Sequence, residues 1–258
     1  MPESMLTQRR ADATAPPHGS VREVLGWVPW LRQVAAATLD RLAEQAVLHR
    51  VPAGSTLFEQ SEIPGFAKLL VSGCVELIAV DDAHEALVEM VRPVDLLLPA
   101  ALLNRQPFLA RGRVLEEAHL VMMHADTFRD AVASDHGLCL AVLACQAAQF
   151  RRQVKMAKNL KLRSAEERVG CYLLDLLQGH DPKRPVRLPL EKRRIAWQLG
   201  MTRETFSRTL ALMMRHGLAV TGDSVEVIDA DALRARFQLD PLIDAPEPIV
   251  PLARRSTP

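Results

Sequence analysis

Four polar side chains gather on one face of a short predicted helix, within the stretch "MTRETFSRTL". Arg203, Glu204, Ser207 and Arg208 recur at spacings that place them on the same side of a helix. Arginine is the usual reader of guanine O6 and N7, glutamate accepts a hydrogen bond from cytosine N4, and serine contacts several bases. A glutamate that faces phosphates is unfavourable unless it reads cytosine or orients an arginine. We therefore expect this face to read base pairs, and a merely solvated surface is the alternative.

The elements that would position this face form a helix-turn-helix. Gly200 can adopt the left-handed conformation of a tight turn, and Thr202 is placed to cap the second helix. Two helices joined by a glycine-containing turn are the helix-turn-helix pattern, whose second helix reads the major groove. Lys192, at the start of the first helix, is expected to contact the phosphate backbone. Each helix has an apolar side at helical spacing, made of Ile195, Ala196 and Leu199 in the first and Phe206, Leu210 and Met213 in the second.

The surrounding segment is basic and ends in a predicted wing. From Arg151 to His216 the chain has sixteen Lys and Arg against six Asp and Glu, a net charge of +10, so the rest carries −9 of the total +1. Such an uneven division indicates an anionic partner for the basic part, here double-stranded DNA. After Gly217 the sequence "LAVTGDSVEVID" predicts two strands joined by a turn at Gly222 and Asp223.

A long helix is predicted before this module, with an apolar stripe along it. The stripe recurs at alternating steps of three and four residues over about three heptads, which is the pattern of a coiled coil. Small alanines in the stripe allow close approach and basic residues flank it, so we expect a homodimer interface. The alternative is that the stripe packs on the chain's own barrel. Its members are Leu140, Leu143, Ala147, Phe150, Val154 and Ala157.

A capping box marks the end of the long helix. In "SAEE", Ser164 can accept a hydrogen bond from the backbone three residues on, and Glu167 can reach back. This ends the long helix near Arg163 and starts another through Leu177, with Gly179 just beyond it. The predicted organisation is a flexible arm (1–20), a β-barrel domain (21–136), a dimerisation helix (137–163), a winged helix-turn-helix (164–237) and a flexible proline-containing tail (238–258).

Between Val47 and Met123 the pattern of short apolar runs and turn residues predicts a β-sandwich or barrel. Short apolar runs such as "AKLLVSGCVELIAV" and "EALVEMV" are interrupted by "SG", "DDAH" and "RPVD", where turns are expected. The stretch "LLLPAALL" predicts a strand end followed by one helical turn. The predicted fold class is therefore α+β, with the barrel before the long helix.

Cysteine usage and hydropathy narrow the remaining function classes. None of the four cysteines has C-x-x-C spacing, so all are expected to pack as small apolar residues, and no metal site is predicted. No run of eighteen apolar residues and no signal-like segment occurs in the sequence, so a cytosolic protein without a membrane partner is expected. The cysteines are Cys74, Cys139, Cys145 and Cys171.

The segment "LPLEKRRIAWQLGMTRETFSRTLALMMRHGL" resembles the winged helix-turn-helix of the Crp/Fnr family of transcription regulators. The resemblance extends over residues 25–237 and implies a jelly-roll barrel like the cyclic-nucleotide-binding domain, with RNA polymerase as a partner. Glu204, Ser207 and Arg208 match the E-x-x-S-R pattern of the Fnr branch, which implies a TTGAT-like inverted repeat. Arg203 departs from that branch and resembles the Crp branch, which leaves the outermost base preference open.

The family's cyclic-nucleotide cassette is not matched. The cassette carries a Gly-Glu pair and a later arginine, whereas this chain has Leu98 and Pro99 and, near the arginine's place, Phe108 or Leu109. Arg111 lies close by, but shifted along the chain. Because a buried phosphodiester needs a positioned cation, cyclic AMP is not expected as a ligand. The N-terminal cysteine cluster of the family's iron–sulfur sensors is also absent from the sequence, so no such cluster is expected.

An apolar ligand remains as the expected signal. Haem would suit an apolar pocket, as in the family's nitric-oxide-responsive regulators of the DNR and NnrR type. The alternative is a barrel that senses no ligand, in a regulator controlled by its own abundance. The pocket is expected against the long helix, lined by Leu96, Leu97, Leu98, Leu102 and Leu103. The conceivable axial ligands are His84, His119 and His124.

An enzyme and a protein-binding adaptor are the alternatives to a DNA-reading protein. An enzyme is not predicted, because the sequence has no G-x-S-x-G, Walker or G-x-G-x-x-G motif. A protein-binding adaptor would need no Glu-Ser-Arg face and would show little salt dependence with DNA. Specific DNA binding weakens steeply with salt, because each phosphate contact releases counterions.

Overall fold

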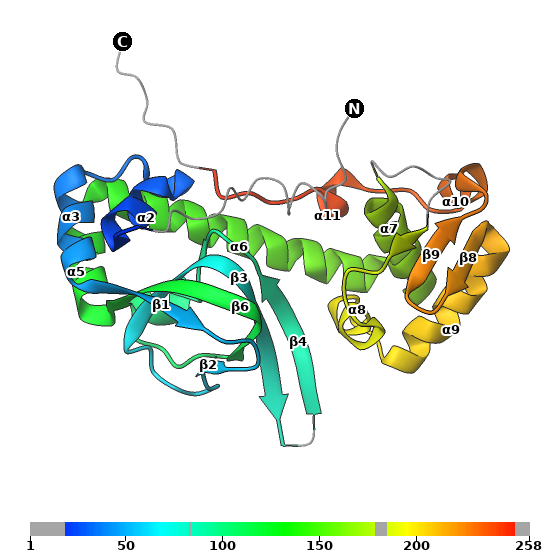
Figure 1. Ribbon diagram of the computed structural model, residues 1–258, viewed down its shortest axis with the longest axis horizontal. Coiled ribbons are helices and arrows are strands. Elements are labelled where there is room, and N and C mark those ends of the chain that lie inside the picture. Colours follow the sequence, from blue (N-terminus) through cyan, green and yellow to red (C-terminus); the bar gives the residue numbers. More distant parts are fainter. Residues whose placement is uncertain (1–18, 83, 179–184, 251–258) are drawn as a thin grey trace, which may run out of the picture. The chain divides into compact units, whose positions relative to one another are not determined.

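The computed structural model describes residues 19–82, 84–178 and 185–250. The chain divides into two compact units (Figure 1). Within the described residues, the first unit runs to Phe150 and includes residues 248–250, and the second runs from Arg151 to Glu247. The predicted N-terminal arm falls outside the described residues up to position 18, and Ser20 caps the first described helix.

The first unit contains one antiparallel sheet, which confirms the predicted barrel domain. The strand order is β1-β6-β3-β4, with β2 paired to β6 and β5 paired to β3. The predicted strand end and helical turn of "LLLPAALL" are β5 and the short helix α4 (Pro99–Asn104). The strands are β1 (Ala46–Val51), β2 (Thr56–Phe58), β3 (Phe66–Asp81), β4 (His84–Val91), β5 (Asp95–Leu96) and β6 (Arg111–His124).

One predicted turn is wrong. The "SG" pair at Ser72 and Gly73 lies inside β3, where the pairing with β6 shifts register. Gly73 has a φ of +86°, and a Cβ there would lie 2.2 Å from the Glu117 carbonyl oxygen. The glycine therefore serves a bulge and a close approach of two strands instead of a reversal of the chain.

Residues of β3 alternate between two cores because successive side chains point to opposite faces of a strand. Before the bulge, Ala67, Leu69 and Val71 pack in a cluster with the helices and Leu70 packs in the barrel interior. The register shifts around Gly73 reverse the faces, so that Leu77 also packs in the interior. The helices that contribute to the first cluster are α2 (Val21–Trp27), η1 (Pro29–Leu31), α3 (Ala36–Glu44), α4, α5 (Ala125–Ser134) and the first part of α6 (His136–Leu162).

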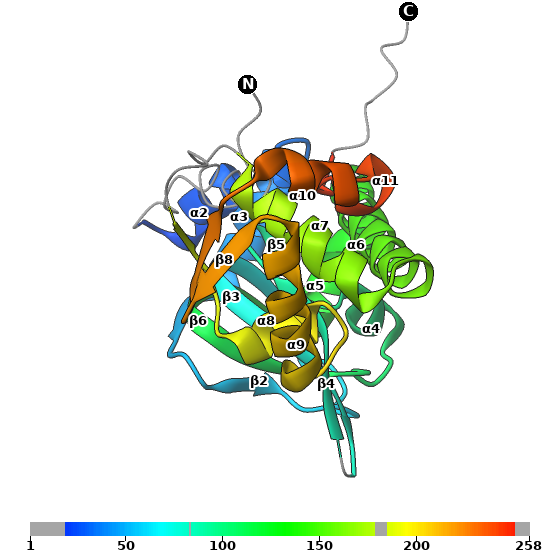
Figure 2. The same ribbon diagram turned by 90° about the vertical axis from the view of Figure 1, so that its right-hand side faces the viewer.

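The second unit holds the predicted winged helix-turn-helix around its own core. Figures 1 and 2 show α8 next to α9, with the β8–β9 hairpin beside them. The elements are α7 (Ala165–Leu177), β7 (Val186–Arg187), α8 (Lys192–Gln198), α9 (Arg203–Met213), η2 (Met214–His216), β8 (Leu218–Thr221), β9 (Ser224–Val227), α10 (Ala230–Arg236) and α11 (Pro241–Asp244).

The joint between α6 and α7 lies where the capping box predicts it. The Glu167 backbone N–H donates to Ser164 Oγ at 3.2 Å, and the Ser164 N–H donates to Glu167 Oε2 at 2.8 Å. This hydrogen bond from Ser164 lowers the pKa of the Glu167 carboxyl. Gly179, expected beyond α7, lies outside the described residues.

The C-terminal segment differs from the flexible tail predicted for 238–258. Its described part, residues 238–250, includes α11, whose Asp240 side chain accepts from the Leu242 N–H at 2.8 Å. Acidic side chains of this segment pair with basic residues of α6 and with Arg163 just after it, and these pairs give the segment a defined course.

Taken singly, no helix in the described part of the chain is long and apolar enough to cross a membrane. Among the described helices, one pair, α5 and α6 taken together and bent by 112°, has the required length and composition.

Candidate nucleic-acid interface

The turn before α9 is built as the sequence predicts. Gly200 has a φ of +62°, which a residue with a side chain adopts only with strain. A Cβ at Gly200 would lie 2.3 Å from Leu160 Cδ2, so a side chain of α6 packs directly on the turn. Thr202 then caps α9, since its Oγ1 accepts a hydrogen bond from the Thr205 N–H at 3.2 Å.

The two sides of α9 differ completely in burial. Phe206, Leu210 and Met213 are buried in the core of the second unit, as predicted. All four predicted reading residues, Arg203, Glu204, Ser207 and Arg208, are exposed on the other side. The structure therefore brings together the whole predicted reading face.

Local contacts leave most of this face available. Arg208 Nη2 donates to Thr205 Oγ1 at 3.4 Å, which steadies the guanidinium on the helix surface. Arg203 and Glu204 form no ion pair with any residue that the structure describes. A charged side chain that is exposed and unpaired can reach a base edge without first losing a protein partner.

The first helix of the pair presents a basic end. Ile195, Ala196 and Leu199 are buried as predicted, and Lys192 is half-buried at the first position of α8. The Arg193 guanidinium lies 4.6 Å from the centre of the Trp197 ring. Sequence reasoning missed this cation–π contact, although the spacing of four residues on a helix is the signal that could have found it.

The wing has the predicted two-residue turn. β8 and β9 pair in register from Thr221 with Ser224 to Leu218 with Val227. Gly222, the first residue of the turn, has a φ of +58°, which suits a tight hairpin. β7 pairs with the outer side of β9, so the hairpin is part of a three-stranded sheet.

The apolar stripe of α6 lies on an exposed face of that helix. Leu143, Phe150 and Val154 are 54%, 67% and 43% exposed, Ala147 and Ala157 are exposed, and Leu140 is half-buried. A different face of α6 packs on the chain's own barrel unit, so the alternative use of the stripe is not what the structure shows. The packed face consists of Leu138, Ala141, Val142, Cys145 and Ala148, with Gln149 Nε2 donating to Asp95 Oδ1 at 2.8 Å.

The five leucines predicted to line a ligand pocket are divided between two packed clusters. Leu96, Leu102 and Leu103 pack in the cluster with the helices, whereas Leu97 and Leu98 pack in the barrel interior. The five leucines are consecutive or nearly so, and an alternating strand followed by a helical turn sends them to two different cores.

The three histidines named as conceivable axial ligands lie in different surroundings. His119 Nδ1 and Ser72 Oγ share a hydrogen bond of 2.8 Å, and the His124 ring lies against Phe66. His84 is exposed at the start of β4. In the parts of the chain that the structure describes, no group of three His, Cys, Asp or Glu side chains could hold a metal ion.

Side chains of the chain itself occupy the barrel interior. Phe58 and Phe108 stack with their ring centroids 4.1 Å apart, and both are buried. The Lys68 ammonium lies 5.3 Å and 5.7 Å from the centres of these rings and its residue is only 6% exposed. Burial lowers the pKa of this ammonium. Arg111, near the place of the family's phosphate-binding arginine, instead pairs with Glu59 and Glu85, each at 2.7 Å.

The sequence matches two protein-family models and several curated relatives. A cyclic nucleotide-binding domain covers residues 48–135, and a Crp-like helix-turn-helix domain covers residues 167–236. The chain is 27% identical over 220 residues to the nitrogen fixation regulation protein FixK of Azorhizobium caulinodans, covering 81% of this chain and 88% of that protein. It is 24% identical over 201 residues to the HTH-type transcriptional regulator Cmr of Mycobacterium tuberculosis, with 78% and 80% covered.

Solved structures share the fold. FixK2 of Bradyrhizobium japonicum superposes with a TM-score of 0.59 at 18% identity, over 76% of this chain and 98% of that chain. The c-di-GMP-responsive global regulator CLP of Xanthomonas campestris superposes with a TM-score of 0.61 at 18% identity, over 76% and 100%. At these identities the likeness shows the architecture alone.

The architecture and the family matches point to the same conclusion. A barrel like the cyclic-nucleotide-binding domain, a long helix and a Crp-like helix-turn-helix follow one another along the chain. The two matching models together cover more than half of the residues, and the curated relatives described above are regulators. The chain belongs to the Crp/Fnr family of DNA-binding transcription regulators.

Proposed function

We propose that this regulator reads a TTGAT-like inverted repeat as a homodimer, through the exposed face of α9. The difference in burial between the two sides of that helix carries the proposal, because its apolar side is buried in the core and its polar side is exposed. Arg208 reads a guanine, Glu204 accepts from a cytosine N4, and Ser207 contacts a neighbouring base. Arg203 acts at the outer end of the half-site.

Phosphate contacts set the register of the protein on the duplex. Lys192 begins α8 and Thr202 caps α9, so both lie at helix N-termini, where backbone N–H groups and the helix dipole favour an anion. Such contacts hold the protein in place without reading sequence. Substitution of these two residues therefore affects all sequences alike.

The dimer forms through the exposed stripe of α6, which presents three large apolar side chains in coiled-coil spacing. Two recognition helices then enter successive major grooves, with half-site centres about 34 Å apart. RNA polymerase is the partner through which the bound dimer changes transcription.

DNA binding without a small ligand is the mode of action that the barrel interior favours. The stacked Phe58 and Phe108 rings and the Lys68 side chain occupy the space between the strands. A regulator of this kind is controlled by its own abundance. A barrel that binds haem and senses nitric oxide is the second candidate, and it would require these side chains to move.

The test is binding of the ligand-free protein to a TTGAT-N4-ATCAA duplex and to a scrambled duplex at the same salt concentration. Tight and selective binding is the expected result. Unselective binding that becomes selective after haem and nitric oxide are added would favour the second candidate. Unselective binding under both conditions would contradict the proposed site.

A further inference from the structure

The chain continues beyond α10 as a strap, which we define as residues 237–247. Its first residues are attached to α7. The Phe237 ring packs on Gly170 so closely that a Cβ at that glycine would lie 2.4 Å from the ring. The next residue, Gln238, accepts a hydrogen bond at its carbonyl oxygen from Cys171 Sγ at 3.5 Å. One end of the strap is thus fixed to the helix that follows the joint.

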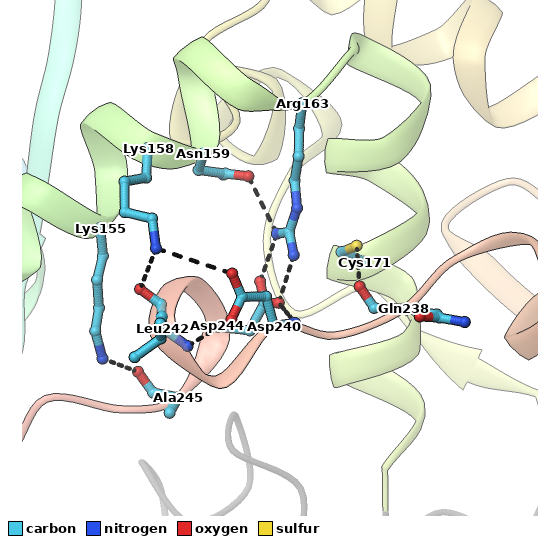
Figure 3. A network of polar contacts seen from close by, with 10 residues as sticks. All are labelled: Lys155, Lys158, Asn159, Arg163, Cys171, Gln238, Asp240, Leu242, Asp244 and Ala245. Carbon is cyan, nitrogen blue, oxygen red and sulfur yellow. Dashed lines mark hydrogen bonds and ion pairs between the residues drawn. The ribbon is translucent and has the colours of Figure 1, made fainter.

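The middle of the strap is fixed at the joint itself. Arg163 is the residue before the Ser164 cap, between the end of α6 and the start of α7. Its Nη1 and Nη2 donate to Asp244 Oδ1 and Oδ2, each at 2.7 Å, and its Nη1 also donates to Asn159 Oδ1 at 3.3 Å (Figure 3). The Arg163 and Asp244 side chains are only 10% and 14% exposed, so water screens this bidentate pair weakly.

The far end of the strap is attached to α6. Lys155 Nζ donates to the Ala245 carbonyl oxygen at 2.8 Å and pairs with Glu247 Oε2 at 2.7 Å. Arg151 binds the other oxygen of Glu247, and this hydrogen bond lowers the pKa of the carboxyl. Lys158 donates to the Leu242 carbonyl oxygen at 3.5 Å (Figure 3).

The strap therefore connects three points: α7, the joint and the last part of α6. Any change in the angle between α6 and α7 would have to break the Arg163–Asp244 pair or the contacts of Glu247. All of these residues lie in the same compact unit as the recognition helix. The basic residues involved belong to the segment whose charge first indicated an anionic partner, and part of that charge is neutralised within the chain.

We propose that the strap positions the reading face, with Asp244 and Glu247 as its positioning residues. By fixing the angle between the dimer helix α6 and the DNA-reading unit, it fixes the separation of the two recognition helices in the dimer. The strap therefore sets which half-site spacing is bound, whereas the bases within each half-site are read by α9 alone. This inference rests on the proposed dimeric DNA reading.

The test compares wild type with Asp244→Asn, which keeps the shape of the side chain and removes its charge. Asp231→Asn is the matched control, because Asp231 is 98% exposed on α10. Half-sites selected by the wild-type protein from a random library are placed in duplexes whose spacers are shorter or longer by one or two base pairs. Each base pair added rotates one half-site by roughly 34° relative to the other. The preferred number of spacer base pairs is therefore sensitive to the angle between α6 and the DNA-reading unit.

Wild type and Asp231→Asn are expected to bind the preferred spacing at least about tenfold more tightly than the others. For Asp244→Asn this preference should fall below about threefold, with the base preferences within a half-site unchanged. The reversed pair, Arg163→Asp with Asp244→Arg, should recover part of the preference. If Asp244→Asn does not bind DNA at all, Glu247→Gln, which breaks only the α6 end, should give the same loss of spacing preference.

Two results would overturn the inference, and they are distinguishable. If Asp244→Asn and Glu247→Gln keep the wild-type spacing preference, the strap does not position the reading face, and the proposed DNA reading stands. If wild type itself selects no repeated half-site from the library, the dimeric DNA reading fails and the positioning role fails with it.

Discussion

Phe58 and Phe108 stack inside the barrel, with their ring centroids 4.1 Å apart and the Lys68 ammonium over both rings. The contact continues to the adjacent strand β6, where Gly112 is the pairing partner of Phe58, and a Cβ at Gly112 would lie 2.4 Å from the Phe58 ring. The two rings thus act as a single packed unit inside the barrel. Their removal is a direct test of whether the interior is a packed core.

Phe108→Ala is predicted to destabilise the protein by about 3–5 kcal/mol, because it removes a buried ring and leaves a cavity between the strands. Urea unfolding measures this difference. Leu109→Ala is the control, since that neighbouring side chain is 85% exposed and should change stability by no more than about 0.5 kcal/mol. Equal effects of the two substitutions would show that the rings do not form a packed core.

Phe150→Glu is predicted to convert the proposed dimer to a monomer. The side chain is 67% exposed at the middle of the α6 stripe, and two glutamates facing each other across the seam would repel and lose apolar contact. Sedimentation at micromolar concentration measures the change. Leu109→Glu makes the same kind of substitution at an exposed leucine outside α6 and should leave the assembly intact. A dimer that survives Phe150→Glu would contradict the predicted interface.

The Cys171 thiol is predicted to react very slowly with iodoacetamide. Burial raises its pKa from 9.0 to about 11, so its thiolate fraction at neutral pH falls by about 10². Peptide mapping of the alkylated protein measures the rate. The same cysteine in the urea-unfolded chain is the reference. A rate in the folded protein close to that reference would show that the segment after Phe237 does not cover the thiol.

Acidification is predicted to remove the contribution of Glu247 to stability. The hydrogen bond from Arg151 holds the pKa of this carboxyl below its ordinary value, so the folded state favours the charged form. A group with a depressed pKa stabilises the protein above its unfolded-state pKa, and the contribution is lost as the pH falls through its folded-state pKa. The difference in unfolding free energy between wild type and Glu247→Gln should therefore be present at pH 7, begin to fall near the unfolded-state pKa of about 4.3, and vanish only below the lower folded-state pKa.

Glu226→Gln is the control for this pH series, since Glu226 is exposed on β9. Its unfolding free energy should differ little from that of wild type over the whole series. A Glu247→Gln difference that persisted unchanged into acid would mean that the charge of Glu247 is not what holds the strap.

Local patterns in the sequence predicted the reading unit well, because each of its features depends on neighbours in the chain. Gly200, Thr202 and the capping box of Ser164 with Glu167 are determined by a few adjacent residues. The alternation of apolar and polar positions on α9 decided in the same way which face is buried.

Contacts between distant residues were not predictable in this way. The Arg163–Asp244 pair joins residues 81 positions apart, and a polar, proline-containing segment otherwise reads as a tail. The apolar character and the adjacency of leucines 96–98 and 102–103 predict that they line one pocket. Their true division between two cores depends on where β5 ends and α4 begins, which hydropathy does not encode.

The most direct test of base reading by α9 is a binding-site selection from a random DNA library with wild type, Arg208→Ala and Lys192→Ala at one salt concentration. Wild type is predicted to enrich an inverted repeat, and Arg208→Ala to lose discrimination at one guanine, at a cost of about 1–3 kcal/mol. Lys192→Ala should enrich the same repeat as wild type with uniformly weaker binding. The account would be contradicted if Arg208→Ala selected the wild-type sequence unchanged.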